Sequence, residues 1–164
     1  MKTVRPFILT AIRAGIAAIC SGKTVITDTQ MALAGIRKTE AGRFGIKLHC
    51  LINDPAVKQT AESQGITRAQ AASDAAASLM NGGICVIGNA PTALLRLMEL
   101  VRVGKAQPAL IIGFPVGFVN AAESKALLIE SDYPYISNMG RKGGSNIAAS
   151  VVNALMILAA NQPL

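Results

Sequence analysis

The stretch GICVIGNAPTALLRLMELVRVG, residues 83–104, decides the fold class. It opens with four apolar residues, 84–87, between two glycines, a pattern typical of a fully buried strand. Pro91 then suits the first turn of a helix, and Gly104 suits the end of one. The stretch therefore predicts a buried β-strand that leads directly into an α-helix.

The same alternation of strand and helix runs along the rest of the chain. The predicted strands are 24–28, 46–52, 83–88, 108–114 and 133–137. The predicted helices are 5–20, 29–36, 54–65, 67–82, 90–104, 120–131 and 145–160, and residues 37–45 read as a polar loop. The helix after Asn53 has the clearest signals, because Asp54 is a good N-cap, Pro55 fits the first turn and Gly65 is a stop.

These strands are continuous apolar runs, which indicates a parallel sheet that is covered on both faces. The sequence therefore predicts an α/β protein with a three-layer open, mostly parallel sheet of about five strands and helices on both faces. No repeat, low-complexity tract or linker divides the chain. We expect one domain that spans residues 1–164.

Composition narrows the class of protein. The chain has 164 residues, of which 51% are hydrophobic and 15% charged, and this is typical of a folded protein with a real core. No apolar stretch reaches the roughly 18 residues that a membrane span needs, and Arg13 interrupts the apolar start that a secretory signal would require. We expect a cytoplasmic protein with no membrane partner, in which Cys20, Cys50 and Cys85 act as small buried hydrophobes and bind no metal.

The net charge of +7 leaves two classes of partner open. The basic residues are spread along the chain without interleaved aromatic residues, so a nucleic-acid surface is weakly supported and we expect none. A basic protein also attracts small polyanionic substrates through its field. Charge alone does not choose between the two.

Ligands of such sheets bind beyond the carboxyl ends of the strands. Three unusual loops follow predicted strands there: GNAPTA (88–93), GFPVGFVNAAESK (113–125) and SNMGRKGGSN (137–146). Each opens a helix and so offers free backbone N–H groups and the positive end of a dipole, and together they would bind an anion with several carboxylates or phosphates. Taken alone, each loop can also be interpreted as an ordinary turn that contains glycine or proline. None of them carries a nucleotide-binding sequence motif.

The candidate binding residues are the polar, charged or flexible positions of these loops, together with Asp28 at the end of the first strand. They are Asp28, Asn89, Thr92, Gly117, Phe118, Glu123, Ser124, Lys125, Arg141, Lys142, Gly143, Gly144 and Ser145. Two of these residues also have a simpler interpretation. Glu123 can stabilise the positive end of the helix dipole, and Lys125 can be a solvated surface residue. The segment 141–145 combines two cations with two glycines and is the expected anion contact. His49 falls in the middle of a predicted strand, which favours a packed structural histidine.

The segments GNAPTAL, PVGFVNAAESK and GRKGGS closely resemble signature segments of the precorrin-8X methylmutase family, also called precorrin isomerases, of cobalamin biosynthesis. The resemblance extends through VITDTQMALAGI, CLINDPAV and TRAQAA and so covers nearly the whole chain. It implies an α/β homodimer whose site, at the dimer edge, holds a corrin-like tetrapyrrole with many carboxylates. The implied reaction moves a methyl group between adjacent ring C carbons of precorrin-8X or cobalt-precorrin-8, without a cofactor.

One feature departs from the family pattern. The family carries a histidine thought to protonate the substrate in an N-terminal segment of several dozen residues, and this chain begins after that segment. His49 matches an apolar strand position of the family, so it does not inherit the role, and the catalytic residue is unknown. The resemblance therefore also implies an alternative, a non-catalytic corrinoid-binding protein or degenerate homologue, N-terminally truncated relative to the family.

Overall fold

The structure is a computed structural model that describes residues 4–161 and the side chains of residues 8–161. At its centre lies a sheet of five strands in the order β2-β1-β3-β4-β5, and every neighbouring pair is parallel. The strands are β1 (Val25–Thr27), β2 (Leu48–His49), β3 (Ile84–Ile87), β4 (Leu110–Gly113) and β5 (Tyr135–Ser137). The predicted class of fold is confirmed.

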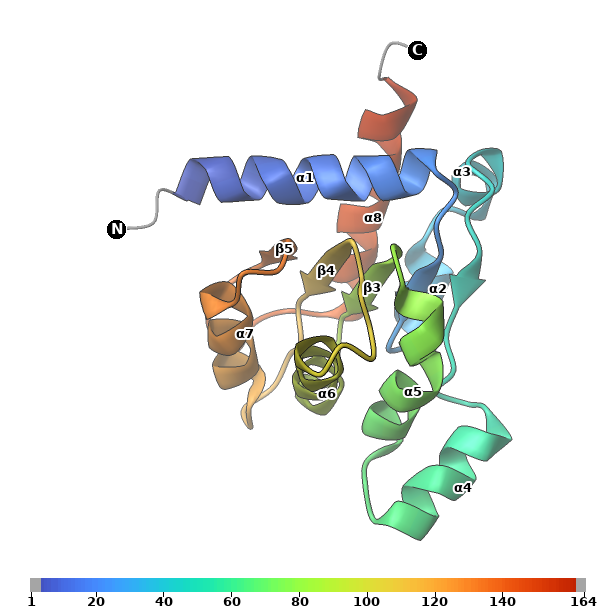
Figure 1. Ribbon diagram of the computed structural model, residues 1–164, viewed down its shortest axis with the longest axis vertical. Coiled ribbons are helices and arrows are strands. Elements are labelled where there is room, and N and C mark those ends of the chain that lie inside the picture. The colour runs from blue at the N-terminus through green and yellow to red at the C-terminus, as the bar shows by residue number, and fades with distance from the viewer. Residues whose placement is uncertain (1–3, 162–164) are drawn as a thin grey trace.

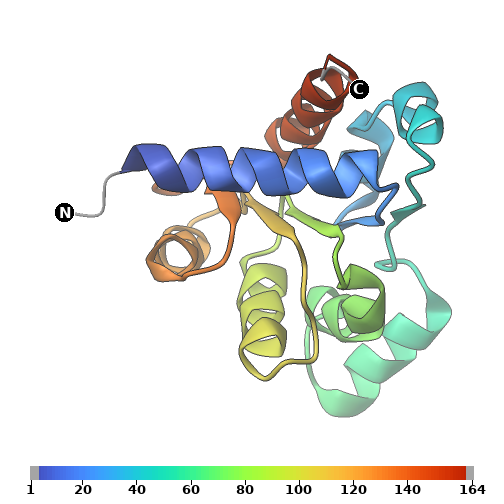
Figure 2. The same cartoon turned by 45° about the horizontal axis from the view of Figure 1, so that its top comes forward.

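Helices cover both faces of this sheet (Figure 1). They are α1 (Val4–Cys20), α2 (Gln30–Gly35), α3 (Lys38–Arg43), α4 (Pro55–Gln64), α5 (Arg68–Ala76), the 3₁₀ turn η1 (Ala77–Met80), α6 (Pro91–Arg102), α7 (Ala121–Glu130) and α8 (Ser145–Ala160). Figure 2 shows α1 and α8 on one side of the sheet, with α5 and α6 on the other. The first and last helices therefore pack on the same layer, although they lie at opposite ends of the described chain.

The strands contribute side chains to two separate cores, one on each face. In β3, Ile84 and Val86 join the core under α1 and α8, whereas Cys85 and Ile87 join the core under α5 and α6. Successive side chains of a strand point to opposite faces, so both sets are buried at once. This explains why the central strands are apolar at every position and do not alternate.

The helix ends follow the local signals of the sequence. The side chain of Asp54 accepts a hydrogen bond from the Ala56 N–H at 2.8 Å, Pro55 is the first residue of α4, and Gly65 ends it with φ of 65°. Thr67 caps α5 in a reciprocal arrangement with Gln70. These short polar contacts satisfy N–H groups that the helix itself leaves free.

Three predicted boundaries were wrong. Residues 37–45 are not a simple loop, because they contain α3, whose buried Ala41 packs into the core. The predicted strand 46–52 is reduced to the two residues of β2, an edge strand that pairs only with β1 and gives way to a turn closed by the Asp54 N–H and the Leu51 carbonyl. The predicted helix 67–82 changes to a 3₁₀ turn after Ala76.

Within residues 4–161, no helix is long and apolar enough to span a lipid bilayer.

Candidate functional site

The loops that follow β3, β4 and β5 meet at the carboxyl edge of the sheet. The Val116 N–H donates to the Asn89 carbonyl at 3.2 Å, and the Gly117 N–H donates to the Arg141 carbonyl at 3.2 Å. A third backbone bond joins the Gly144 N–H to the Phe114 carbonyl at 2.9 Å. The expectation that these loops share one edge is confirmed, and we call them together the edge loops.

Two glycines allow the edge loops to approach this closely. A Cβ atom at Gly88 would lie 2.5 Å from the Cα of Ser145, the first residue of α8. A Cβ atom at Gly143 would collide with the backbone carbonyl oxygens of Phe114 and Pro115. Any larger residue at either position would push the loops apart, so the glycines make the corner compact.

Asp28 lies directly after β1 and binds the loop that opens α6. Its Oδ1 accepts the Gly88 N–H at 2.8 Å, and its Oδ2 accepts the N–H groups of Asn89 and Ala90, both at 2.9 Å. Burial raises the pKa of Asp28, and the three backbone donors offset part of that rise because they favour the ionised form. The N–H groups at the start of α6 therefore bind the carboxylate of Asp28 and are not free for a ligand. The expectation that all three helix starts offer free N–H groups was wrong at this helix.

A hydrogen bond between two hydroxyl groups joins the start of α8 to the start of α2. The Oγ atoms of Thr29 and Ser145 are 2.7 Å apart, and Thr29 Oγ1 also accepts the Ala32 N–H at 3.1 Å. Ser145, a predicted site residue, is buried. Thr29 was missed by the sequence analysis, although its place between a strand and a helix is typical of an N-cap.

Lys125 and Ser124 are completely buried in α7, with 0% of each residue exposed. The plainer interpretation of Lys125 as a solvated surface residue was therefore wrong. Its ammonium donates to Oδ1 of Asn138 at 3.1 Å and to the Lys142 carbonyl at 2.6 Å. Asn138 was not among the predicted site residues, because nothing local in the sequence reveals a partner 13 residues away.

An exposed rim of cationic and apolar side chains borders the edge loops. Phe118 is 85% exposed, and the guanidinium carbon of Arg141 lies 5.8 Å from the centre of its ring. Met139 is 83% exposed beside Arg141 in the chain, and Lys142 is exposed as well. We call Phe118, Met139, Arg141 and Lys142 the rim, and it offers apolar surface together with two positive charges.

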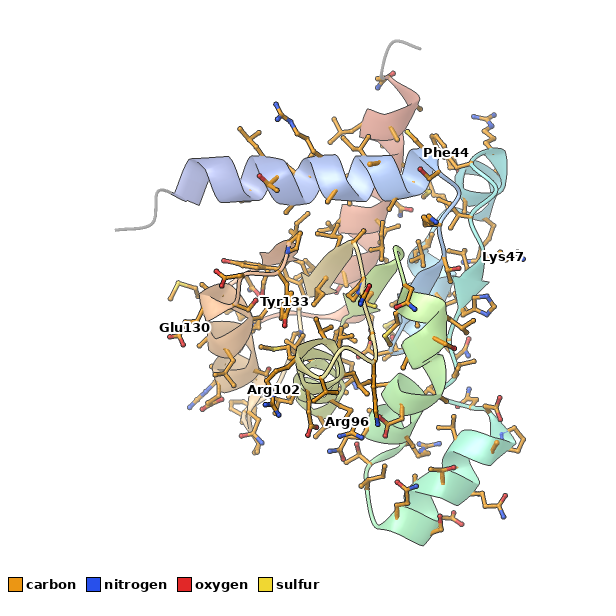
Figure 3. The ribbon with its side chains drawn as sticks, viewed as in Figure 1. Phe44, Lys47, Arg96, Arg102, Glu130 and Tyr133 are labelled. Atoms are coloured by element: carbon orange, nitrogen blue, oxygen red, sulfur yellow. The ribbon has the colours of Figure 1, made fainter. Side chains whose placement is uncertain are left out.

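Most of the described cations, those of the rim included, have no carboxylate partner, and Arg96 is the clearest exception. Arg96 projects from α6 toward α5 (Figure 3), where its Nε lies 2.7 Å from Oδ1 of Asp74, and its Nη1 lies 2.6 Å from Oε2 of Glu99. Among residues 8–161, no carboxylate lies within 4.0 Å of the charged groups of Arg141 or Lys142. The rim thus has positive charge that its described neighbours leave unneutralised.

The remaining predicted residues occupy varied positions. Asn89 and Glu123 are exposed, Gly117 is half-buried, and the half-buried Thr92 accepts a hydrogen bond from the Thr67 hydroxyl at 3.2 Å. His49 was predicted in the middle of a strand, and this was wrong, because it is the last residue of β2 and lies level with Ile26 of β1. Within the described part of the chain, no three His, Cys, Asp or Glu side chains gather closely enough to bind a metal ion.

Fold and site together define an α/β protein with a basic, partly apolar surface at the carboxyl edge of a parallel sheet. The family model for precorrin-8X methylmutase matches residues 3–158. The chain belongs to the precorrin-8X methylmutase family.

Individual proteins of this family are similar to the chain in sequence and in structure. The cobalt-precorrin-8 methylmutase of Priestia megaterium is 47% identical over 149 residues, which are 91% of this chain and 66% of that protein. A crystal structure of precorrin-8X methylmutase from Thermus thermophilus superposes with a TM-score of 0.84 at 41% identity, over 92% of this chain and 73% of that one. A solved precorrin-8X methylmutase related protein has a TM-score of 0.80 at 32% identity, and the match spans 96% of this chain and 95% of that one.

The chain therefore spans about two thirds of the length of its Priestia megaterium relative and almost the full length of one solved relative.

Proposed function

We propose that this chain binds a corrin-like tetrapyrrole with several carboxylates and acts as an isomerase that moves a methyl group between adjacent carbons of ring C. The observation that carries the proposal is the rim at the edge loops, where the exposed Arg141 lies over the exposed ring of Phe118 and the exposed Lys142 follows it in the chain. A tetrapyrrole of this class presents an apolar ring system edged by anions. Family membership supplies the reaction, and the rim supplies a surface of matching chemistry.

In and around the edge loops, we assign the predicted residues to two groups by exposure. The exposed side chains of Asn89, Phe118, Glu123, Arg141 and Lys142 can touch a ligand directly. The buried or half-buried group shapes the loops from below: Asp28, Thr92, Gly117, Ser124, Lys125, Gly143, Gly144 and Ser145. Phe118 would pack on the face of the macrocycle, and the cations would pair with its peripheral carboxylates.

The printed names of two relatives differ in the metal content of the substrate. The Priestia megaterium protein is named for cobalt-precorrin-8, and the Thermus thermophilus protein is named for precorrin-8X. Our proposal concerns the tetrapyrrole that both names share. In either case the metal is part of the substrate and is not a cofactor of the enzyme.

A binding experiment tests the role of the rim. We expect that changing Arg141 and Lys142 together to Ala weakens the affinity for hydrogenobyrinic acid, the metal-free product, and flattens its dependence on salt, because two charge-assisted contacts are lost. The matched control changes two exposed cations to Ala: Arg102, the last residue of α6 (Figure 3), and Lys105 in the turn that follows it. Equal affinities of the two double variants, measured by absorbance titration at low salt, would refute the role of the rim.

A turnover experiment tests the isomerase itself. Substrate and product differ in conjugation, so incubation with precorrin-8X should change the absorbance spectrum to that of hydrogenobyrinic acid. Binding of the product without any conversion of the substrate would favour a non-catalytic corrinoid-binding protein. Absence of both binding and conversion would remove the proposed function altogether.

We also infer that the chain works as a homodimer, with the ligand surface at the dimer edge. Large apolar side chains stay uncovered in addition to the rim, including Val119 of the edge loops at 75% exposure and Met31 of α2 at 71%. A second copy of the chain would cover part of this surface and would enclose a macrocycle from a second side.

A further inference from the structure

Lys125 is a charged residue whose side chain is buried away from every described carboxylate. None of its surface is exposed, and no carboxylate among residues 8–161 lies within 4.0 Å of its ammonium. Burial lowers the pKa of Lys125, because the charged form loses its hydration. A buried ammonium is costly unless hydrogen bonds compensate it, so its contacts indicate what it does.

Those contacts join α7 to the loop after β5. The ammonium donates to Oδ1 of Asn138 at 3.1 Å and to the carbonyl of Lys142 at 2.6 Å. Nδ2 of Asn138 donates to the same Lys142 carbonyl at 2.9 Å. The three groups form a closed network that fastens both ends of the segment 138–142 to the buried side of α7.

This network acts on the segment that carries both cations of the rim. The carbonyl of Arg141 accepts the Gly117 N–H, and the carbonyl of Lys142 accepts the ammonium of Lys125. Both carbonyls are thus bound inside the protein, while the side chains of Arg141 and Lys142 are exposed. A segment held in this way presents its cations in one arrangement before the ligand arrives, which reduces the entropy lost on binding.

We propose that Lys125 is a positioning residue: its buried ammonium holds the segment 138–142 so that Arg141 and Lys142 face the ligand. This inference rests on the proposed function for the identity of the ligand, but the effect on the segment does not depend on any ligand. Lys125 itself touches no solvent, so it acts through the backbone of Lys142 and the amide of Asn138.

Limited proteolysis tests the effect on the segment, because trypsin cleaves after Arg141 and Lys142. In Lys125→Met, which matches the lysine side chain as far as Cε but removes the ammonium, we expect cleavage at these two sites to become about tenfold faster, in line with the loss of a charged hydrogen bond. Cleavage after Lys58 in α4 and Arg68 in α5 should not change, and Lys125→Arg should restore part of the protection.

The ligand experiment is separate. We expect Lys125→Met to bind hydrogenobyrinic acid about tenfold more weakly than the wild type, which corresponds to about 1.4 kcal/mol. In turnover, KM should rise more than kcat falls, because the segment contributes binding and not the chemical step. If Lys125→Met does not fold, Asn138→Ala keeps the lysine and removes one acceptor, and it should change cleavage and affinity in the same direction.

Two results would overturn the inference. One is cleavage after Arg141 and Lys142 at the wild-type rate in both Lys125→Met and Asn138→Ala. The other is faster cleavage with unchanged affinity, in a protein whose affinity does fall when Arg141 and Lys142 are replaced. A wild type that fails to bind hydrogenobyrinic acid would instead contradict the proposed function, and the proteolysis result would still decide whether Lys125 holds the segment.

Discussion

At the scale of single residues, Cys85 of β3 is the clearest case of a side chain whose chemistry is set by burial. It is 1% exposed, and burial raises the pKa of its thiol from 9.0 to about 12. Between these values the unfolded chain loses the thiol proton while the folded chain keeps it. The free energy of unfolding therefore falls as the pH rises through this window, by at most about 1.4 kcal/mol per pH unit for this one group.

Urea unfolding of the wild type and Cys85→Ala between pH 8.5 and 10.5 measures this effect. Cys85→Ala should be less stable at pH 8.5, because it leaves a small cavity, but the difference should shrink as the pH rises. Cys20→Ala is the matched control that removes a thiol without opening a buried cavity, because Cys20 is exposed and not buried as the sequence predicted. A constant difference between Cys85→Ala and the wild type would show that the thiol does not titrate in this way.

At the scale of elements, the start of α6 depends on a carboxylate from another strand. Asp28→Asn places an amide where three backbone N–H groups need acceptors, so its NH₂ group faces donors. We expect the change to lower the free energy of unfolding by about 1–3 kcal/mol, the usual cost of an unsatisfied buried group. Urea denaturation near pH 7 measures it.

The chain contains its own control for this substitution. Asp54 caps α4 at an exposed position, where Asn is as good a cap as Asp. Asp54→Asn should therefore change stability by less than about 0.5 kcal/mol. Equal effects at the two positions would mean that the three contacts of Asp28 contribute no more than one exposed cap.

The elements also show what sequence reasoning can and cannot reach. β3 and α4 were predicted well because their signals are local: an apolar run between glycines, or Asp54, Pro55 and Gly65 at one helix. The extent of β2 was missed, because an edge strand gains hydrogen bonds from only one neighbour. The Asp28 contacts span 60 to 62 residues and those of Lys125 span 13 and 17, so only the folded chain reveals them.

At the scale of the whole molecule, the uncovered apolar surface leads to a prediction about assembly. We expect light scattering at micromolar concentration to give twice the monomer mass. If the rim lies in the interface, Phe118→Ser should shift the equilibrium toward the monomer, because it removes an exposed apolar side chain of the rim. The control is Leu127→Ser, which removes an exposed apolar side chain of α7. A wild-type mass equal to one chain would contradict the dimer.

The packing of α8 has a consequence for the order of assembly during translation. Ser145 lies against Gly88 and Thr29, and α8 contacts both α1 and α2, so the corner that holds the edge loops is built partly from the last helix described. The ribosome delivers that helix after every strand of the sheet has already emerged. A nascent chain can thus gather its strands early, but the corner formed by the edge loops closes only when α8 leaves the exit tunnel and docks against α1 and α2.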